Sequence, residues 1–244
     1  MSGADHTAAP RTDRLRPAPR WYLRTNRWWA RFLMRRRFAV VLHDVAHVPA
    51  TGPVIYAANH IGVVDGPLLA IFSPRPAHAL TKREMFRGPL GAFLWLSGQI
   101  PLDRERVDVR AVRLAVRALR DGQVVGIFPE GTRGDGLVSH AHYGAAYLAL
   151  VTGAPVVPVA ILGSREPGAS GGSLPASGGT VHMVYGETLQ FAPQPWPRTR
   201  VDVAAAGERL RAHLAAHVVH AQRLTGVALP GPLPAPAGPA APPS

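Results

Sequence analysis

Short apolar runs alternate with longer amphipathic stretches along most of the chain. The apolar runs predict buried strands at residues 54–57, 124–127, 156–162 and 181–185. Apolar positions at helical spacing predict helices at residues 107–120 and 143–152, and Gly153 is a suitable end for the second. Because strands and helices alternate, we expect a single α/β domain in which a mixed β-sheet is flanked by helices.

Two of the predicted helices have distinct sides. In residues 107–120 we expect a core-facing set, Val109, Val112, Val116 and Leu119, and an opposite basic stripe, Arg110, Arg113, Arg117 and Arg120. Thr199 to Asp202 resembles a capping box and predicts a helix that runs to about His220. Three histidines share one side of that helix, and we interpret them as structural rather than metal-binding: His213, His217 and His220.

Composition divides the chain into four segments. Residues 1–19 and 228–244 are rich in Ala and Pro, which predicts disordered tails. Residues 20–37 predict an amphipathic helix that is both basic and aromatic. Residues 38–227 would form the domain itself.

The helix predicted at residues 20–37 combines a stripe of arginines with aromatic side chains at the same period. Such a helix is typical of the headgroup region of an anionic membrane. We therefore predict membrane contact through Trp21, Arg24, Arg27, Trp28, Trp29, Arg31 and Phe32. The alternative is a surface helix that the same aromatic side chains hold on its own domain.

A candidate base and a carboxylate to orient it, His60 and Asp65, follow the strand at residues 54–57. Residues five apart do not face each other on a straight helix, so the chain must turn between them, and Gly62 makes that turn easy. Asp65 would then begin a helix with Pro67 in its first turn. The chain has no cysteine, so we expect the base to activate a hydroxyl of the substrate. The alternative is a structural histidine beside a helix cap.

A second polar cluster, residues 128–133, follows the strand at residues 124–127 and supplies an acid, a flexible turn, a hydroxyl and a guanidinium. The carboxyl ends of buried strands are where α/β folds place their sites, so the two clusters are expected to meet.

Together these blocks resemble the lysophosphatidic acid acyltransferases, also called 1-acylglycerol-3-phosphate acyltransferases. Asn59-His60 with Asp65 is similar to the family's first block, and residues 98–104 are similar to its second. Residues 128–133 are similar to the third block and residues 156–159 to the fourth. Residues 81–84 resemble the family's basic linker. The resemblance covers about residues 38 to 191.

The resemblance implies transfer of a fatty acyl chain from acyl-CoA or acyl-carrier protein to the free hydroxyl of 1-acylglycerol 3-phosphate. The product would be phosphatidic acid, in phospholipid biosynthesis. It implies that His60 deprotonates the hydroxyl and that Asp65 orients His60. The implied substrate-binding residues are Lys82, Arg104, Glu130, Gly131, Thr132 and Arg133, with the arginines on the phosphate and Glu130 and Gly131 on the glycerol. No metal and no organic cofactor are implied.

Two departures from the family pattern bear on the acceptor. Pro101 stands where a large apolar or aromatic residue is usual, and residues 138–144 contain His140 and His142 where a Phe-Lys-like segment is common. We interpret both histidines as the start of a solvent-facing helix. An acyltransferase with another lysolipid or glycerol-like acceptor and a non-catalytic lipid-binding protein both remain open.

The charge agrees with an anionic partner. The formal net charge is +12, and Lys82 is the only lysine. Lipid headgroups, coenzyme A and carrier proteins all supply negative charge, whereas no nucleic-acid recognition motif is present. The chain has no run of about 20 apolar residues and no signal-peptide pattern. We therefore expect peripheral association with the cytoplasmic face of the cell membrane.

Overall fold

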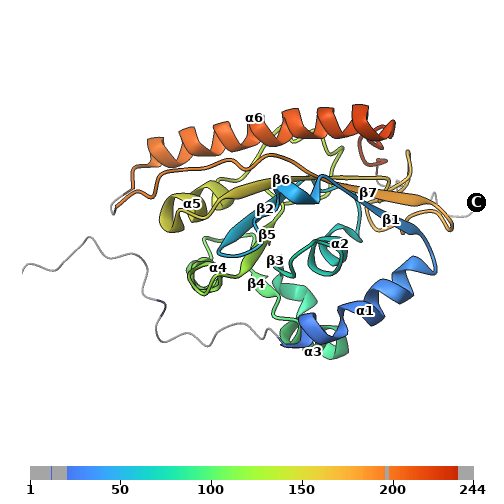
Figure 1. Ribbon diagram of the computed structural model, residues 1–244, viewed down its shortest axis with the longest axis horizontal. Helices are drawn as coiled ribbons and strands as arrows, with labels where there is room; N and C mark the ends of the chain where they lie inside the picture. The colour runs from blue at the N-terminus through green and yellow to red at the C-terminus, as the bar shows by residue number, and fades with distance from the viewer. Residues whose placement is uncertain (1–11, 13–20, 196–197, 236–244) are drawn as a thin grey trace, which may run out of the picture.

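The computed structural model describes residue 12 and residues 21–195 and 198–235. Across these residues the chain forms one sheet with the strand order β1-β7-β6-β2-β5-β3-β4 (Figure 1). The strands are β1 (Ala39–His43), β2 (Val54–Ala58), β3 (Ala77–Lys82), β4 (Ile100–Leu102), β5 (Val124–Ile127), β6 (Val156–Leu162) and β7 (Thr180–Tyr185). β6 and β7 are antiparallel and all other neighbours are parallel, which confirms the expected mixed sheet.

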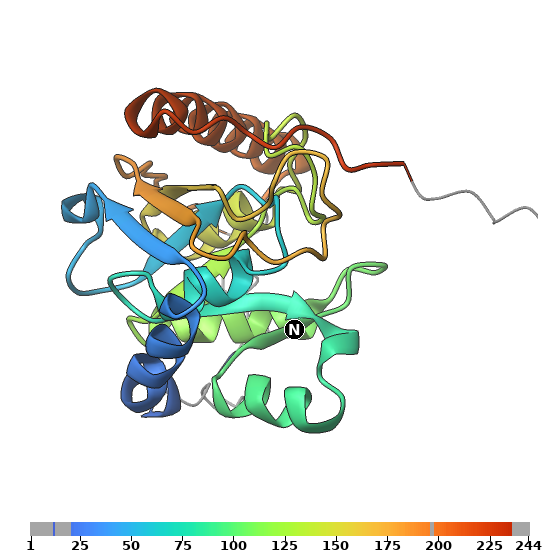
Figure 2. The same cartoon turned by 90° about the vertical axis from the view of Figure 1, so that its right-hand side faces the viewer.

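Helices cover both faces of this sheet. They are α1 (Trp21–Arg35), α2 (Asp65–Ile71), α3 (Gly88–Leu96), α4 (Val109–Arg120), α5 (Gly144–Thr152) and α6 (Arg200–Thr225), with the short 3-10 turns η1 (Val45–His47) and η2 (Arg83–Met85). One apolar cluster joins α4, α5 and α6 to the sheet, and another joins α2 to its opposite face. Figure 1 shows α6 along the top of the molecule and α1 and α3 at the bottom, and Figure 2 keeps α1 and α3 at the same lower end.

The central strands are apolar on both faces because both faces are covered. In β2, Ile55 and Ala57 belong to the cluster beneath α4, α5 and α6, whereas Tyr56 and Ala58 belong to the cluster beneath α2. A strand buried on both sides has near-continuous apolar sequence rather than alternation. This is why the central strands β2, β5 and β6 could be predicted as apolar runs.

The prediction for the inner face of α4 was partly wrong. Val109 is the first residue of α4 and is 54% exposed, although Val116 and Leu119 are buried as expected. The remaining buried positions are alanines, namely Ala111, Ala115 and Ala118. Small side chains let the helix approach the sheet closely, so the large apolar residues alone did not define the buried face.

α6 is longer than predicted, and the segment that follows it packs against the domain. α6 continues to Thr225 and ends where Gly226 adopts a left-handed conformation with φ 70°. Beyond it, Leu229 packs against the cluster beneath α6, and the carbonyl of Gly231 accepts a hydrogen bond from Arg165. Disorder was expected from residue 228, but residues 228–235 are described; residues 236–244 lie outside the described part.

Two of the three histidines of α6, His213 and His217, bind backbone carbonyls, and the ring of His220 stacks on that of His217. His217 Nε2 lies 2.9 Å from the carbonyl oxygen of Val184, and His213 Nε2 lies 3.0 Å from that of Glu187. These contacts join α6 to β7 and to the segment that follows it, as expected of structural side chains.

Two arginines of α1, Arg27 and Arg31, bind the C-terminal end of α2. The sequence had instead predicted that they contact lipid. The Arg27 guanidinium donates to the carbonyls of Ile71, at 2.7 Å, and Ser73, and Arg31 Nε donates to Ile71 at 2.9 Å. Helix C-termini carry unsatisfied carbonyls and partial negative charge, so cations are stabilising there. Burial lowers the pKa of Arg27 to about 10, and the neighbouring Arg31 acts in the same direction.

The aromatic side chains of α1 remain exposed. Trp28, Trp29 and Phe32 have exposed fractions of 60%, 51% and 49%, and the two indole rings stack with their centroids 4.5 Å apart. The side chains of Trp21 and Arg24 lie outside the described part. Within the described ranges, no helix has both the length and the apolar character needed to cross a bilayer.

Candidate active site

The candidate site begins where β2 ends. Asn59, the first residue after β2, exchanges two hydrogen bonds with Ile161 of β6: its Nδ2 donates to the carbonyl at 3.1 Å, and its Oδ1 accepts from the amide at 2.7 Å. The Asn59 side chain thus bonds the backbone of β6 just beyond the last paired residues of β2 and β6. The backbone therefore leaves the sheet at a fixed place, and His60 follows at once.

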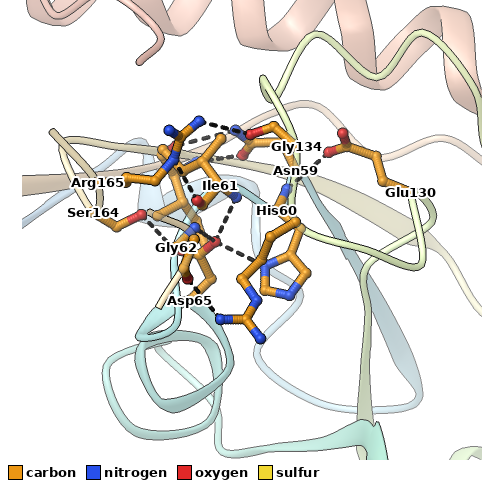
Figure 3. A network of polar contacts seen from close by, with 12 residues as sticks. Asn59, His60, Ile61, Gly62, Asp65, Glu130, Gly134, Ser164 and Arg165 are labelled. Atoms are coloured by element: carbon orange, nitrogen blue, oxygen red, sulfur yellow. Dashed lines mark hydrogen bonds and ion pairs between the residues drawn. The ribbon is translucent and has the colours of Figure 1, made fainter. Parts of the chain in front are cut away.

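His60 and Asp65 are brought together as the spacing predicted. His60 Nδ1 lies 2.9 Å from Asp65 Oδ2, and that oxygen also accepts from the amides of Ile61 at 2.7 Å and Gly62 at 2.8 Å (Figure 3). The Asp65 side chain is fully buried, and that of His60 is partly exposed. With Nδ1 directed at the carboxylate, Nε2 is the ring nitrogen on the opposite side, in position to accept a proton.

Ser164 completes the carboxylate's surroundings. Its hydroxyl donates to the second oxygen of Asp65. A Cβ at Gly62 would lie only 2.7 Å from the Ser164 carbonyl oxygen, so glycine is required for the two loops to meet. Ser164 was not predicted from the sequence, although it lies two residues beyond β6, at the same sheet edge as the two predicted clusters.

Arg165 is a second residue that sequence analysis missed. It is 2% exposed, and its guanidinium donates to the carbonyls of Ile61 at 2.8 Å, Ala169 at 2.9 Å, Gly134 at 3.0 Å and Gly231 at 2.5 Å. One side chain thus ties together the loop of His60, the loop after Glu130, its own loop and the C-terminal segment. An arginine so close to an apolar strand is the signal that could have revealed it, since buried charges require partners.

Glu130 reaches the same loop from β5. Its Oε1 accepts from the His60 amide at 2.8 Å, and the ring of Phe128 stacks on the imidazole with centroids 4.3 Å apart. Burial raises the pKa of the Glu130 carboxyl to about 7. The hydrogen bond from His60 opposes that rise, whereas the charges of Asp135 and Asp65 add to it.

The other predicted substrate-binding residues lie nearer the surface. Arg104 donates to the carbonyl of Gly131 at 2.5 Å, which brings the second and third sequence blocks together, and Arg133 donates to Gly171 at 2.6 Å. Thr132 is exposed. Lys82 lies 3.9 Å from Glu84, with both side chains about half exposed.

Pro101, the first departure from the family pattern, is in β4, an edge strand, where a missing amide is tolerated.

The arrangement has the parts needed to activate a hydroxyl beside an anionic group. A histidine held by a buried carboxylate can accept a proton, and the exposed guanidinium groups of Arg104 and Arg133 can bind phosphate oxygens. Gly131, with φ +70°, is packed under His142: a Cβ there would lie 2.7 Å from the imidazole. His142 therefore contacts the loop of residues 128–133, and its amide donates to the Pro129 carbonyl at 2.7 Å. His140 and His142 are both exposed and precede α5 rather than lying within it.

Replacing Arg165 with methionine should destabilise the chain. The substitution leaves several carbonyls without their donor, and an unsatisfied buried polar group costs about 1–3 kcal/mol, so we expect a loss of about 3 kcal/mol or more in the free energy of unfolding. Urea denaturation measures it. Arg113→Met on the exposed side of α4 is the matched control and should change stability by less than about 0.5 kcal/mol. Equally small losses of stability in the two variants would contradict the conclusion that Arg165 holds these loops together.

The free energy of unfolding should depend on Glu130 between about pH 4.5 and pH 7. Because the pKa of Glu130 is raised in the folded chain, its contribution to stability is fully present below its ordinary value of 4.5 and is lost as the pH rises through about 7. Glu130→Gln removes this titration and keeps an oxygen acceptor for the His60 amide. The free energy of unfolding of the variant, relative to that of the unmodified chain, should therefore rise with pH in a series of denaturation experiments. If the two free energies changed with pH in parallel, the raised pKa of Glu130 would be contradicted.

Comparison with known proteins agrees with this geometry. The Acyltransferase family profile matches residues 39–162, which include every strand from β1 to β6. The 1-acyl-sn-glycerol-3-phosphate acyltransferase of Bacillus subtilis (strain 168) is 29% identical over 180 residues, covering 73% of this chain and 87% of that protein. The human 1-acyl-sn-glycerol-3-phosphate acyltransferase beta is 31% identical over 144 residues, covering 57% of this chain and 50% of that protein.

A solved structure shares the fold. The crystal structure of the 1-acyl-sn-glycerophosphate (LPA) acyltransferase PlsC from Thermotoga maritima matches with a TM-score of 0.64 at 22% identity, covering 84% of this chain and 80% of that one. The family match spans half of the chain and contains His60, Asp65 and Glu130. On these grounds the chain belongs to the acyltransferase family.

Proposed function

We propose that this chain transfers a fatty acyl group from a thioester donor to the free hydroxyl of 1-acylglycerol 3-phosphate, forming phosphatidic acid in phospholipid biosynthesis. The observation that carries the proposal is the His60–Asp65 pair, in which a buried carboxylate binds Nδ1 at 2.9 Å and leaves Nε2 for the substrate. The names of the Bacillus subtilis and human relatives support this acceptor.

The reaction proceeds by direct attack of the acceptor. His60 Nε2 takes the hydroxyl proton as the acceptor oxygen forms a bond to the thioester carbonyl carbon. The carbon–sulfur bond then breaks, and the thiolate leaves with the proton that His60 held. The Asp65 carboxylate fixes the tautomer of His60 and stabilises its cation. The donor is acyl-CoA or acyl-carrier protein as co-substrate, and the proposed steps use no metal and no organic cofactor.

The acceptor phosphate is assigned to the basic residues around the site. Arg104 and Arg133 now donate to backbone carbonyls on exposed loops, so both can exchange those acceptors for phosphate oxygens. Lys82 adds a third cation from the end of β3. Glu130, Gly131 and Thr132 contact the glycerol, where a protonated Glu130 can donate a hydrogen bond that an ionised one cannot.

His60→Ala should lower acyl transfer by at least about a thousandfold, within the range that general bases supply. His213→Ala, which alters an imidazole on α6, is the control and should retain activity. The assay uses a long-chain acyl-CoA, a carrier-protein thioester and a set of lysolipids in mixed micelles, with products identified by mass spectrometry.

The same assay separates the candidate acceptors. Phosphatidic acid as the main product supports the assigned acceptor. Another acylated lipid would keep the His60 mechanism and contradict the headgroup assignment. Substantial turnover by His60→Ala would contradict the base, and lysolipid binding without turnover by the unmodified chain would favour a non-catalytic binding protein.

We further propose that α1 docks the enzyme on the cytoplasmic face of the membrane through Trp28, Trp29 and Phe32. Their exposed rings suit the headgroup region, whereas Arg27 and Arg31 hold α2. Trp21 and Arg24 remain part of this assignment from the sequence alone.

Replacing Trp28, Trp29 and Phe32 with serine should weaken sedimentation with phosphatidylglycerol-containing vesicles by about tenfold or more, since much apolar area stays in water. These substitutions are preferable to deletion of residues 1–37, which would also remove the arginines that hold α2. Val201→Ser, at an exposed position of α6, is the control. Unchanged sedimentation of the triple variant would contradict docking by α1.

A further inference from the structure

The helix α3 is apolar on every side, yet several of its large side chains are about half exposed. Its sequence, GPLGAFLWL, contains no charged side chain, and its one polar side-chain group is the indole N–H of Trp95. Gly91 and Leu94 are its buried positions, whereas Leu90, Phe93, Trp95 and Leu96 are between 43% and 50% exposed. A helix with apolar residues all round is normally buried, and an exposed apolar patch of this kind marks an interaction site.

The inner side of α3 is fixed by the turn before it. A Cβ at Gly91 would lie 2.3 Å from the carbonyl carbon of Phe86, so only glycine permits this approach. The ring of Phe86 in turn meets Trp95 edge-on, with centroids 5.3 Å apart. The outward direction of the remaining apolar side chains is therefore a consequence of the fold.

Exposed basic residues precede α3 in the chain. Lys82, Arg83 and Arg87 are all exposed, and Glu84 is the one acid among them, so this short segment carries a net charge of +2. Met85, in η2, adds a further exposed apolar side chain. Exposed aromatic and aliphatic side chains beside cations are the composition of segments that rest in the headgroups of an anionic bilayer.

The position of α3 agrees with that occupant. Both views place α3 at the same end of the molecule as α1, whose exposed rings are assigned to the membrane (Figures 1 and 2). A planar lipid surface can contact two elements at one end of a molecule at once, and two partial insertions add their free energies.

We propose that the segment of residues 83–96, comprising η2 and α3, is a second membrane-contact surface. Phe93, Trp95 and Leu96 enter the interfacial region of an anionic bilayer, and Arg83 and Arg87 lie on its headgroups. With α1, this gives two contacts with the bilayer, which fix the tilt of the molecule on the surface. The inference rests on the proposed function only in taking a lipid surface as the partner.

The direct test uses the tryptophan that α3 already carries. Replacing Trp21, Trp28, Trp29 and Trp196 with phenylalanine leaves Trp95 as the only indole, while α1 keeps aromatic side chains. Phosphatidylglycerol vesicles whose acyl chains carry bromine should quench Trp95 fluorescence about twofold or more. A matched probe with Trp95→Phe and Val201→Trp places the indole on exposed α6 and should not be quenched.

A second measurement keeps the proposal falsifiable if the probe variant folds poorly. Phe93→Ser with Leu96→Ser should weaken vesicle sedimentation by about fivefold with an unchanged circular dichroism spectrum, and Val201→Ser should not weaken it. Neither measurement uses a substrate, so the result is independent of whether the proposed reaction is correct.

Three outcomes would overturn the proposal. Vesicle binding without quenching of Trp95 would assign the contact to α1 alone. A Trp95 signal that responds to an acidic acyl-carrier protein but not to vesicles would assign α3 to the donor. A dimer in sedimentation velocity that dissociates in the Phe93→Ser, Leu96→Ser variant would show that a second copy covers α3.

Discussion

The site depends on keeping the Asp65 carboxylate buried. A carboxylate that leaves water is stable only when hydrogen bonds replace its hydration. One oxygen binds His60 and the amides of Ile61 and Gly62, and the other accepts from Ser164. The turn after β2, the glycine within it and the loop after β6 therefore follow from one requirement, because each supplies or admits a donor. The orientation of His60 is a further consequence, since its Nδ1 is one of those donors.

These donors come from separate strands, so their relative position has to be maintained over long stretches of sequence. Asn59 bonds β6 directly, and Arg165 returns from β6 to the carbonyl of Ile61. Glu130 adds a contact from β5 to the His60 amide. Since β5, β2 and β6 are adjacent and parallel, their carboxyl ends lie at one sheet edge, and short side-chain contacts can join the three loops.

Burial and the sequence distance between partners explain which elements and residues the sequence could predict. β2, β5, β6 and β7 were predicted because their sequences are apolar runs, and His60 with Asp65 because their contact is local. β1, β3 and β4 were not predicted, because β1 and β4 are edge strands and β3 contains polar residues. Ser164 and Arg165 were missed because their partners lie about a hundred residues away, at Asp65 and Ile61. The helical stripe of arginines in α1 was recognised, but period alone does not distinguish a lipid phosphate from the carbonyls at the end of α2. The apolar helix α3 was not predicted, because its buried and exposed sides are both apolar and therefore give no amphipathic pattern.

The contacts of α2 connect the candidate active site to α1. α2 begins at Asp65, whose side chain holds His60, and six residues later the carbonyl of Ile71 accepts from Arg27 and Arg31 of α1. A helix of this length is rigid, so the place and tilt of α1 are tied to those of the imidazole. The arginines stay on the domain while Trp28 and Trp29 remain exposed, and each side chain therefore has one role. An N-terminal helix arranged in this way holds the site at a fixed distance from whatever surface its aromatic face contacts.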